Sequence, residues 1–193
     1  LRLAIEKARQ ANMPKENIGR AIDRGLGKGG GGQLEAVTYE GFGPGKVALL
    51  VEAVTDNRNR TTSEVRNIIE RAGGAFAGPG AVSWMFSDEG VIVIPKDGRS
   101  IDEFLDLAIE AGAEDVAESG DAVEVYTKPN TLESVKKVLI DKGLSPQSSE
   151  ISKKPSSTVQ ISDKDLAKKI LDLMEKLESL DDVQKVYANF DIP

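Results

Sequence analysis

The sequence predicts an α+β protein with a helical, truncated N-terminal region followed by two ferredoxin-like α/β sandwich domains, one inserted in the other. Three observations lead to this fold class. Helical periodicity at the N-terminus ends in a glycine-rich stretch at 25–32. Beyond it, about two strand-like segments occur for each helix, the ratio of a sandwich with helices on one face of an antiparallel sheet. The last segment, 158–193, is a single β-α-β unit that needs a sheet to join.

Two helices are expected before the glycine-rich stretch. The first covers residues 1–11, and Pro14 suits the first turn of the second, which should end near Gly25. Because the helical pattern already runs at Leu1, we expect this region to be truncated. Residues 25–32 then form a flexible linker, since a dinucleotide-binding glycine motif requires a strand before it and a helix after it.

The segment after the linker is typical of a hairpin followed by a helix and two more strands. Gly-Pro-Gly at 43–45 suits the turn of the hairpin. Thr61 and Glu64 have the spacing of a capping box, so a helix is expected to begin at Thr61. Alternating or continuous apolar residues predict strands at 37–42, 47–54, 81–86 and 90–94.

The same signals continue in the second half of the chain. Ser100 and Glu103 repeat the capping-box spacing, and further helices are expected after the caps Asn130 and Ser162. Strands are expected at 122–126, 148–152, 158–161 and 186–192.

These elements suggest three parts of the chain. They are an N-terminal region with its linker at 1–32, a central domain formed by 33–87 plus 158–193, and an inserted domain at 88–157. Two consecutive domains are the alternative arrangement.

Composition excludes many classes of function. The 193 residues include no cysteine and no histidine, which rules out disulfides, thiolate chemistry, Ser-His-Asp triads and histidine metal sites. No apolar run approaches the roughly 20 residues of a membrane span, and no signal-peptide pattern occurs. We therefore expect a cytoplasmic protein without a metal or cofactor. An enzyme acting on a phosphorylated small molecule is a weaker alternative.

The run Thr55–Thr61 is the main candidate site. Asn57, Arg58, Asn59 and Arg60 lie between a buried strand and the expected helix start. A helix N-terminus offers free N–H groups and partial positive charge, and two arginines beside it suit a phosphate. The same arginines are also compatible with ion pairs to nearby carboxylates or with simple solvation.

The basic N-terminal end is the second candidate site. Residues 1–30 contain seven Lys or Arg and three Asp or Glu, within a chain of net charge −7. Such an asymmetry favours contact of this end with a polyanion, although a solvated pair of helices explains it equally well. The candidate residues are Lys7, Arg9, Lys15, Arg20 and Arg24.

The chain resembles the YebC/PmpR family along its whole length. The resemblance rests on LRLAI at 1–5, NMPKENI at 12–18, YEGFGPG at 39–45, TDNRNRT at 55–61, EAGAEDV at 110–116 and LDDVQKVYANF at 180–190. It implies a helical N-terminal domain and two α/β domains, one inserted in the other. It also implies a non-catalytic role in gene expression: bacterial members resemble DNA-binding transcriptional regulators, and others act in translation on the ribosome or on mRNA.

The resemblance, together with the basic residues, implies nucleic acid as the partner, either DNA or ribosomal and messenger RNA. No helix-turn-helix, zinc finger or aromatic RNA motif of standard form occurs, so base-specific recognition is not predicted from the sequence. Binding through phosphates should weaken steeply with salt.

Overall fold

The computed structural model describes residues 5, 8–9, 13–26 and 34–192. The chain divides into two compact units, Leu1–Ser83 with Thr158–Pro193, and Trp84–Ser157. Within the N-terminal region, α2 covers Lys15–Gly25. It ends at Gly25 as predicted, and it begins one residue after Pro14, which was expected inside its first turn. The helix predicted at 1–11 and the linker lie mostly outside the described residues.

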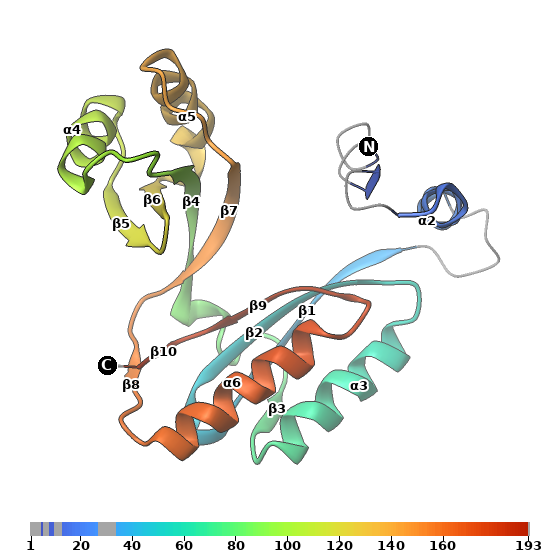
Figure 1. Cartoon of the computed structure of the whole chain (residues 1–193). Helices are drawn as coiled ribbons and strands as arrows, with labels where there is room; N and C mark the ends of the chain where they lie inside the picture. Colours follow the sequence, from blue (N-terminus) through green and yellow to red (C-terminus); the bar gives the residue numbers. More distant parts are fainter. Residues whose placement is uncertain (1–4, 6–7, 10–12, 27–33, 193) are drawn as a thin grey trace. The chain divides into compact units, whose positions relative to one another are not determined.

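The first unit contains a four-stranded antiparallel sheet with the order β3-β1-β2-β9. Two helices cover one face of this sheet (Figure 1). The turn between β1 and β2 is the short helix η1, Pro44–Lys46. The strands are β1 (Glu35–Phe42), β2 (Ala48–Thr55), β3 (Ala75–Ala77) and β9 (Val183–Ala188), and the helices are α3 (Arg58–Arg71) and α6 (Lys164–Glu178). A separate parallel pair is formed by β8 (Val159–Gln160) and β10 (Phe190–Asp191).

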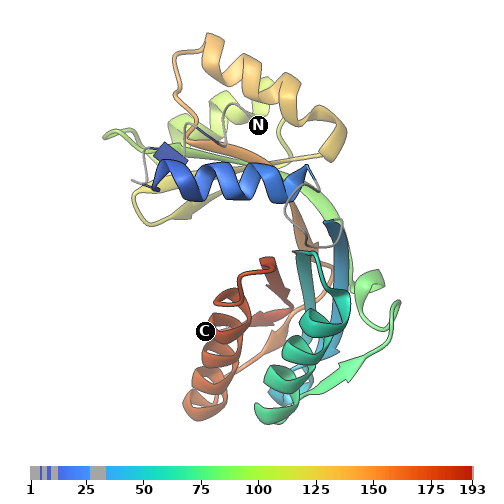
Figure 2. The ribbon, with the colours of Figure 1, turned by 90° about the vertical axis from the view of Figure 1, so that its right-hand side faces the viewer.

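Strand alternation places the core of the first unit between the sheet and the helices. Tyr39 lies opposite Val51, and both are buried with Ile69 of α3 and Leu173 of α6. Figure 2 shows α3 and α6 side by side on this face. This burial is what keeps α3 in place, because an isolated helix of its length is marginal in water.

The carboxylate of Glu40 holds the loop at 80–83 near the other face of the same sheet. Glu40 follows Tyr39, so its side chain points away from the helices, and it is only 6% exposed. Its two oxygens accept backbone hydrogen bonds from Gly80 at 2.7 Å, Val82 at 2.6 Å and Ser83 at 2.9 Å. Burial raises the pKa of Glu40, but these hydrogen bonds outweigh it and hold the pKa below its usual value.

The second unit is another sandwich. Its antiparallel sheet has the order β5-β6-β4-β7, and two helices pack on one face, where Ile92 and Val125 of the sheet are buried with Phe104 of the first helix. The capping box of Ser100 and Glu103 is present at the first of these helices. The elements are β4 (Phe86–Pro95), α4 (Ile101–Ala111), β5 (Asp115–Ser119), β6 (Ala122–Thr127), α5 (Leu132–Asp141) and β7 (Ser148–Pro155).

The predicted fold class is confirmed, and several local predictions are wrong. No strand covers 81–86: Ser83–Met85 form the short helix η2, and Trp84 is 74% exposed. The strands β3 and β5 were not predicted, because both are short and lack an alternating apolar pattern. The caps expected for the helices α5 and α6 also differ from those in the structure. Asn130 lies in the short helix η3 (Pro129–Thr131) before α5, and Asp163 rather than Ser162 caps α6. The three predicted domain ranges remain a prediction.

Candidate nucleic-acid interface

Helix α3 begins three residues earlier than predicted. Its N-cap is Asn57, whose side-chain oxygen accepts a hydrogen bond from the backbone N–H of Arg60 at 3.1 Å. Thr61 is fully buried and instead donates its hydroxyl hydrogen inward to Asp182 Oδ2 at 2.6 Å, with Thr55 Oγ1 lying 2.8 Å from the same hydroxyl. The predicted start at Thr61 is therefore wrong, because this threonine is already inside the helix. Arg58 and Arg60 belong to the first turn of α3.

Arg60 is neutralised by two carboxylates. Its Nη2 lies 2.7 Å from Asp182 Oδ2 and 3.0 Å from Asp56 Oδ1. The hydrogen bond to Asp182 is the main reason that the pKa of Arg60 is raised. Burial raises the pKa of Asp182, but hydrogen bonds from Thr61, Arg60 and Thr55 lower it overall. The ion-pair alternative left open by the sequence thus applies to Arg60, whose guanidinium holds the turn before β9 against the start of α3.

Arg58 is placed differently from Arg60. It is exposed, and within the described part of the chain its guanidinium has no hydrogen bond or ion pair. Its backbone carbonyl accepts hydrogen bonds from Thr62 Oγ1 at 2.6 Å and from the Tyr39 hydroxyl at 3.4 Å. The backbone of Arg58 is therefore fixed while its charge faces solvent, which suits contact with an anion.

A shallow groove of about 450 Å³ follows the outer side of α3. Together with Arg58, the residues of this groove form what we call the α3 face. Helical spacing of four residues arranges them in two adjacent rows. The α3 face consists of Arg58, Asn59, Thr62, Ser63, Arg66 and Asn67.

Arg66 is a functional candidate that the sequence analysis missed. Its guanidinium carbon lies 4.8 Å from the centre of the Phe76 ring, and that ring lies 6.1 Å from the ring of the buried Tyr39. Stacking of this kind orients a guanidinium without neutralising it. The available signal was the spacing of eight residues from Arg58, which places both arginines on one side of a helix.

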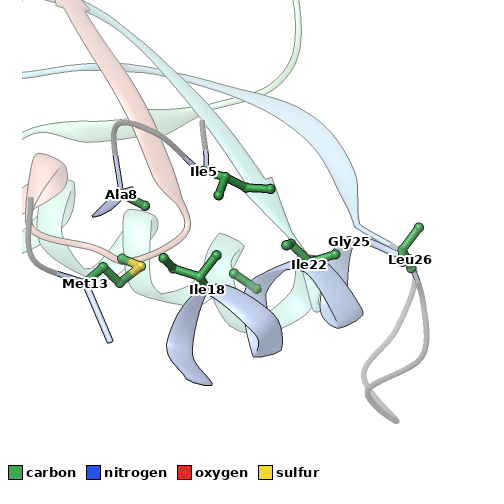
Figure 3. A pocket seen from close by; sticks show the side chains of 8 residues that line it. Ile5, Ala8, Met13, Ile18, Ile22, Gly25 and Leu26 are labelled. Carbon is green, nitrogen blue, oxygen red and sulfur yellow. The ribbon is translucent and has the colours of Figure 1, made fainter. Parts of the chain in front are cut away.

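The structure describes part of the basic N-terminal end. Arg9, Lys15 and Arg20 are exposed, and Arg20 Nη2 donates a hydrogen bond to Asn17 Oδ1 at 2.8 Å. Lys7 and the side chain of Arg24 lie outside the described residues. The apolar side of α2 contributes to a groove of about 400 Å³ (Figure 3). The residues lining it are Ile5, Ala8, Met13, Ile18, Ala21, Ile22, Gly25 and Leu26.

Among the residues that the structure describes, no cluster of three or more acidic side chains is arranged to hold a metal ion. No described helix is long and apolar enough to cross a membrane.

The fold and the α3 face define a class: an α+β protein of two sandwich units that carries an exposed arginine pair on one helix. Residues 34–190 match the family model described as TACO1/YebC second and third domain. The chain therefore belongs to the YebC family, as its motifs indicated.

Relatives in this family are similar along the whole chain. A protein of Dictyoglomus thermophilum named probable transcriptional regulatory protein is 52% identical over 194 residues, covering 100% of this chain and 78% of the relative. A relative of the same name in Aquifex aeolicus is 50% identical and covers 100% of this chain and 78% of its own length. A crystal structure of a conserved hypothetical protein from Aquifex aeolicus has a TM-score of 0.86 at 50% identity, covering 100% of this chain and 79% of that one.

Proposed function

We propose that this protein is a transcriptional regulator that binds DNA through contacts with its phosphates and catalyses no reaction. The names of the relatives support the regulatory role. The observation that carries the DNA contact is the pair Arg58 and Arg66, two exposed guanidinium groups on one helix side in a chain of net charge −7. A guanidinium group that has no carboxylate partner remains available to neutralise a phosphate of the DNA backbone.

The two predicted sites contribute differently to phosphate binding in this proposal. Arg58, with Asn57 and Asn59 beside it, lies at the α3 N-terminus, where free backbone N–H groups add to the attraction for phosphate. Arg60 acts mainly by fixing that turn through its ion pairs. The basic residues of the N-terminal end add further phosphate contacts. They are Lys7, Arg9, Lys15, Arg20 and Arg24.

Fluorescence anisotropy with a labelled 30-base-pair duplex, measured over a salt series, tests the proposal. Binding should weaken steeply with salt, and Arg58→Ala and Arg66→Ala should each reduce the slope of log K against log salt by about 1. Arg71→Ala removes the same charge from the last turn of α3 and serves as the matched control. Slopes unchanged in both variants, relative to this control, would overturn the assignment of these arginines.

The alternative is a translation factor that binds the ribosome or mRNA in the cytoplasm. The same residues serve both roles, because DNA and RNA share the phosphate chemistry. Co-sedimentation with ribosomes, compared with duplex DNA binding at the same salt concentration, separates them. Ribosome association without DNA binding would replace the proposed function by the alternative.

A further inference from the structure

We infer that the α3 face recognises base edges in the major groove of duplex DNA, with Asn59, Arg66 and Asn67 as the reading side chains. This inference rests on the proposed DNA binding and goes beyond its phosphate contacts. The sequence by itself did not predict base recognition, since no standard motif is present. The structure adds the relative placement of these three side chains along one groove.

Helix geometry spaces the reading side chains over a length that matches a few base pairs. Asn59, Ser63 and Asn67 follow one another at four-residue intervals, and Arg58, Thr62 and Arg66 form the neighbouring row. At 1.5 Å per residue, each row extends about 12 Å along the helix axis, which corresponds to about 3–4 base pairs. The major groove is about 12 Å wide and admits an α-helix.

The chemistry of the α3 face matches base edges. An asparagine amide can bond adenine through N6 and N7 at once, and an arginine guanidinium can bond guanine through O6 and N7. Asn59, Ser63 and Asn67 are all exposed. The Ser63 hydroxyl is used within the helix, where it donates to the Asn59 carbonyl at 2.9 Å. The two amides and the guanidinium are therefore the groups left for base contacts.

Arg66 is oriented before any DNA arrives. Its guanidinium carbon lies over the Phe76 ring, 4.8 Å from the ring centre, and Phe76 belongs to the edge strand β3. A side chain that is already ordered loses less entropy on binding, which favours specific contact over a loose phosphate contact. Arg66 can thus contact a base edge in addition to attracting phosphate, whereas the unrestrained Arg58 suits the phosphate backbone alone.

Charge along the α3 face favours its N-terminal part for close approach of DNA. Of the two acidic residues in α3, Glu64 lies on the opposite side from Arg66, whereas Glu70 follows Arg66 by one helical turn, at the C-terminal end of the face. In Figure 1, α3 lies over the sheet with α6 on one flank. The major groove of A-form RNA is too deep and narrow for side chains to read, so this surface should prefer B-form DNA.

Selection from a pool of random DNA duplexes at about 150 mM salt tests the inference. The wild-type chain should enrich a core of about 3–4 base pairs containing adenine and guanine. The double variant Asn59→Ala with Asn67→Ala should lose at least about tenfold in affinity for the enriched duplex, because each good bidentate contact gives about fivefold or more and two are removed. Its affinity for unrelated duplexes should change less than about twofold. Asn130→Ala, at an exposed asparagine of the second unit, is the matched control.

The possible outcomes separate the inference from the proposed function. Salt-dependent DNA binding with no enriched sequence overturns the base recognition and leaves the phosphate contacts intact. The base recognition is also overturned if the double variant prefers the enriched sequence as strongly as the wild-type chain does. Failure to bind any duplex overturns both, and binding of RNA in preference to DNA overturns the inference and supports a translational role. Circular dichroism of each variant confirms that these exposed substitutions leave the fold unchanged.

Discussion

Replacing Glu40 should destabilise the first unit in a graded and pH-dependent way. In Glu40→Gln, the amide oxygen can remain where Oε2 serves Val82 and Ser83, while the new NH2 group faces the N–H of Gly80. One hydrogen bond is lost, and two others lose their charge assistance, at about 1 kcal/mol each. Because water can reach the exposed Gly80, we expect a net loss of about 2 kcal/mol in the free energy of unfolding.

The alanine variant should cost more than the glutamine variant. Glu40→Ala leaves the N–H of the fully buried Val82 without an acceptor, so the expected loss is about 4 kcal/mol. Urea unfolding followed by tryptophan fluorescence measures both variants, since the only tryptophan, Trp84, directly follows Ser83. Glu35→Gln, at an exposed position of the same strand, is the control and should change stability by less than about 0.5 kcal/mol.

The effect of the Glu40 charge should depend on pH. The pKa of Glu40 is lower in the folded chain than its usual value, so its contribution is fully present above that usual value. The contribution is lost as the pH falls through the lowered folded-state pKa. The difference between wild type and Glu40→Gln should therefore be largest near pH 7 and shrink below about pH 4. Equal unfolding midpoints for Glu40→Gln and Glu35→Gln at pH 7 would refute the reasoning.

Three further substitutions test other contacts. Asp182→Asn should cost about 1–3 kcal/mol at pH 7 in urea unfolding and progressively less in acid, because hydrogen bonds hold the pKa of this carboxyl below its usual value; an equal cost in strong acid would contradict this. Gly90→Ala would place a Cβ in steric conflict with Thr127 Oγ1, so thermal unfolding should show a loss of about 1–3 kcal/mol, whereas Gly78→Ala, with open space around it, serves as the control. Ser100→Ala removes the cap of α4 and should cost about 1 kcal/mol; helical hydrogen exchange that stays unchanged would argue against it.

Periodicity and capping signals predicted most of the elements correctly. The capping box at Ser100 and the proline before α2 act over three or four residues, so the sequence shows them directly. The same reasoning failed at Thr61, where the capping-box spacing was present by coincidence. The N-cap is Asn57, and Thr61 lies inside the helix. There its hydroxyl donates to Asp182, a partner that local sequence does not show.

The N-terminal part of the candidate site, Arg58 and Asn59, could be found from the sequence, but neither the rest of the α3 face nor the state of its charges. The run from Asn57 to Arg60 was recognisable from its two arginines beside a strand end. Whether each arginine was free depended on distant residues. Asp182, 122 residues away, neutralises Arg60, while no described carboxylate pairs with Arg58.

The sequence by itself determined the helices and longer strands, the absence of cysteine and histidine chemistry, and the family, because these depend on composition, short-range spacing and similarity. Only the tertiary structure decided which arginine is neutralised, that Glu40 holds a loop, and that Arg66 rests on Phe76. Each of these is a contact across the sheet or between elements, and such contacts exist only when the chain brings the partners together. Burial and hydrogen bonding then fix the charges in a way that residue order alone does not reveal.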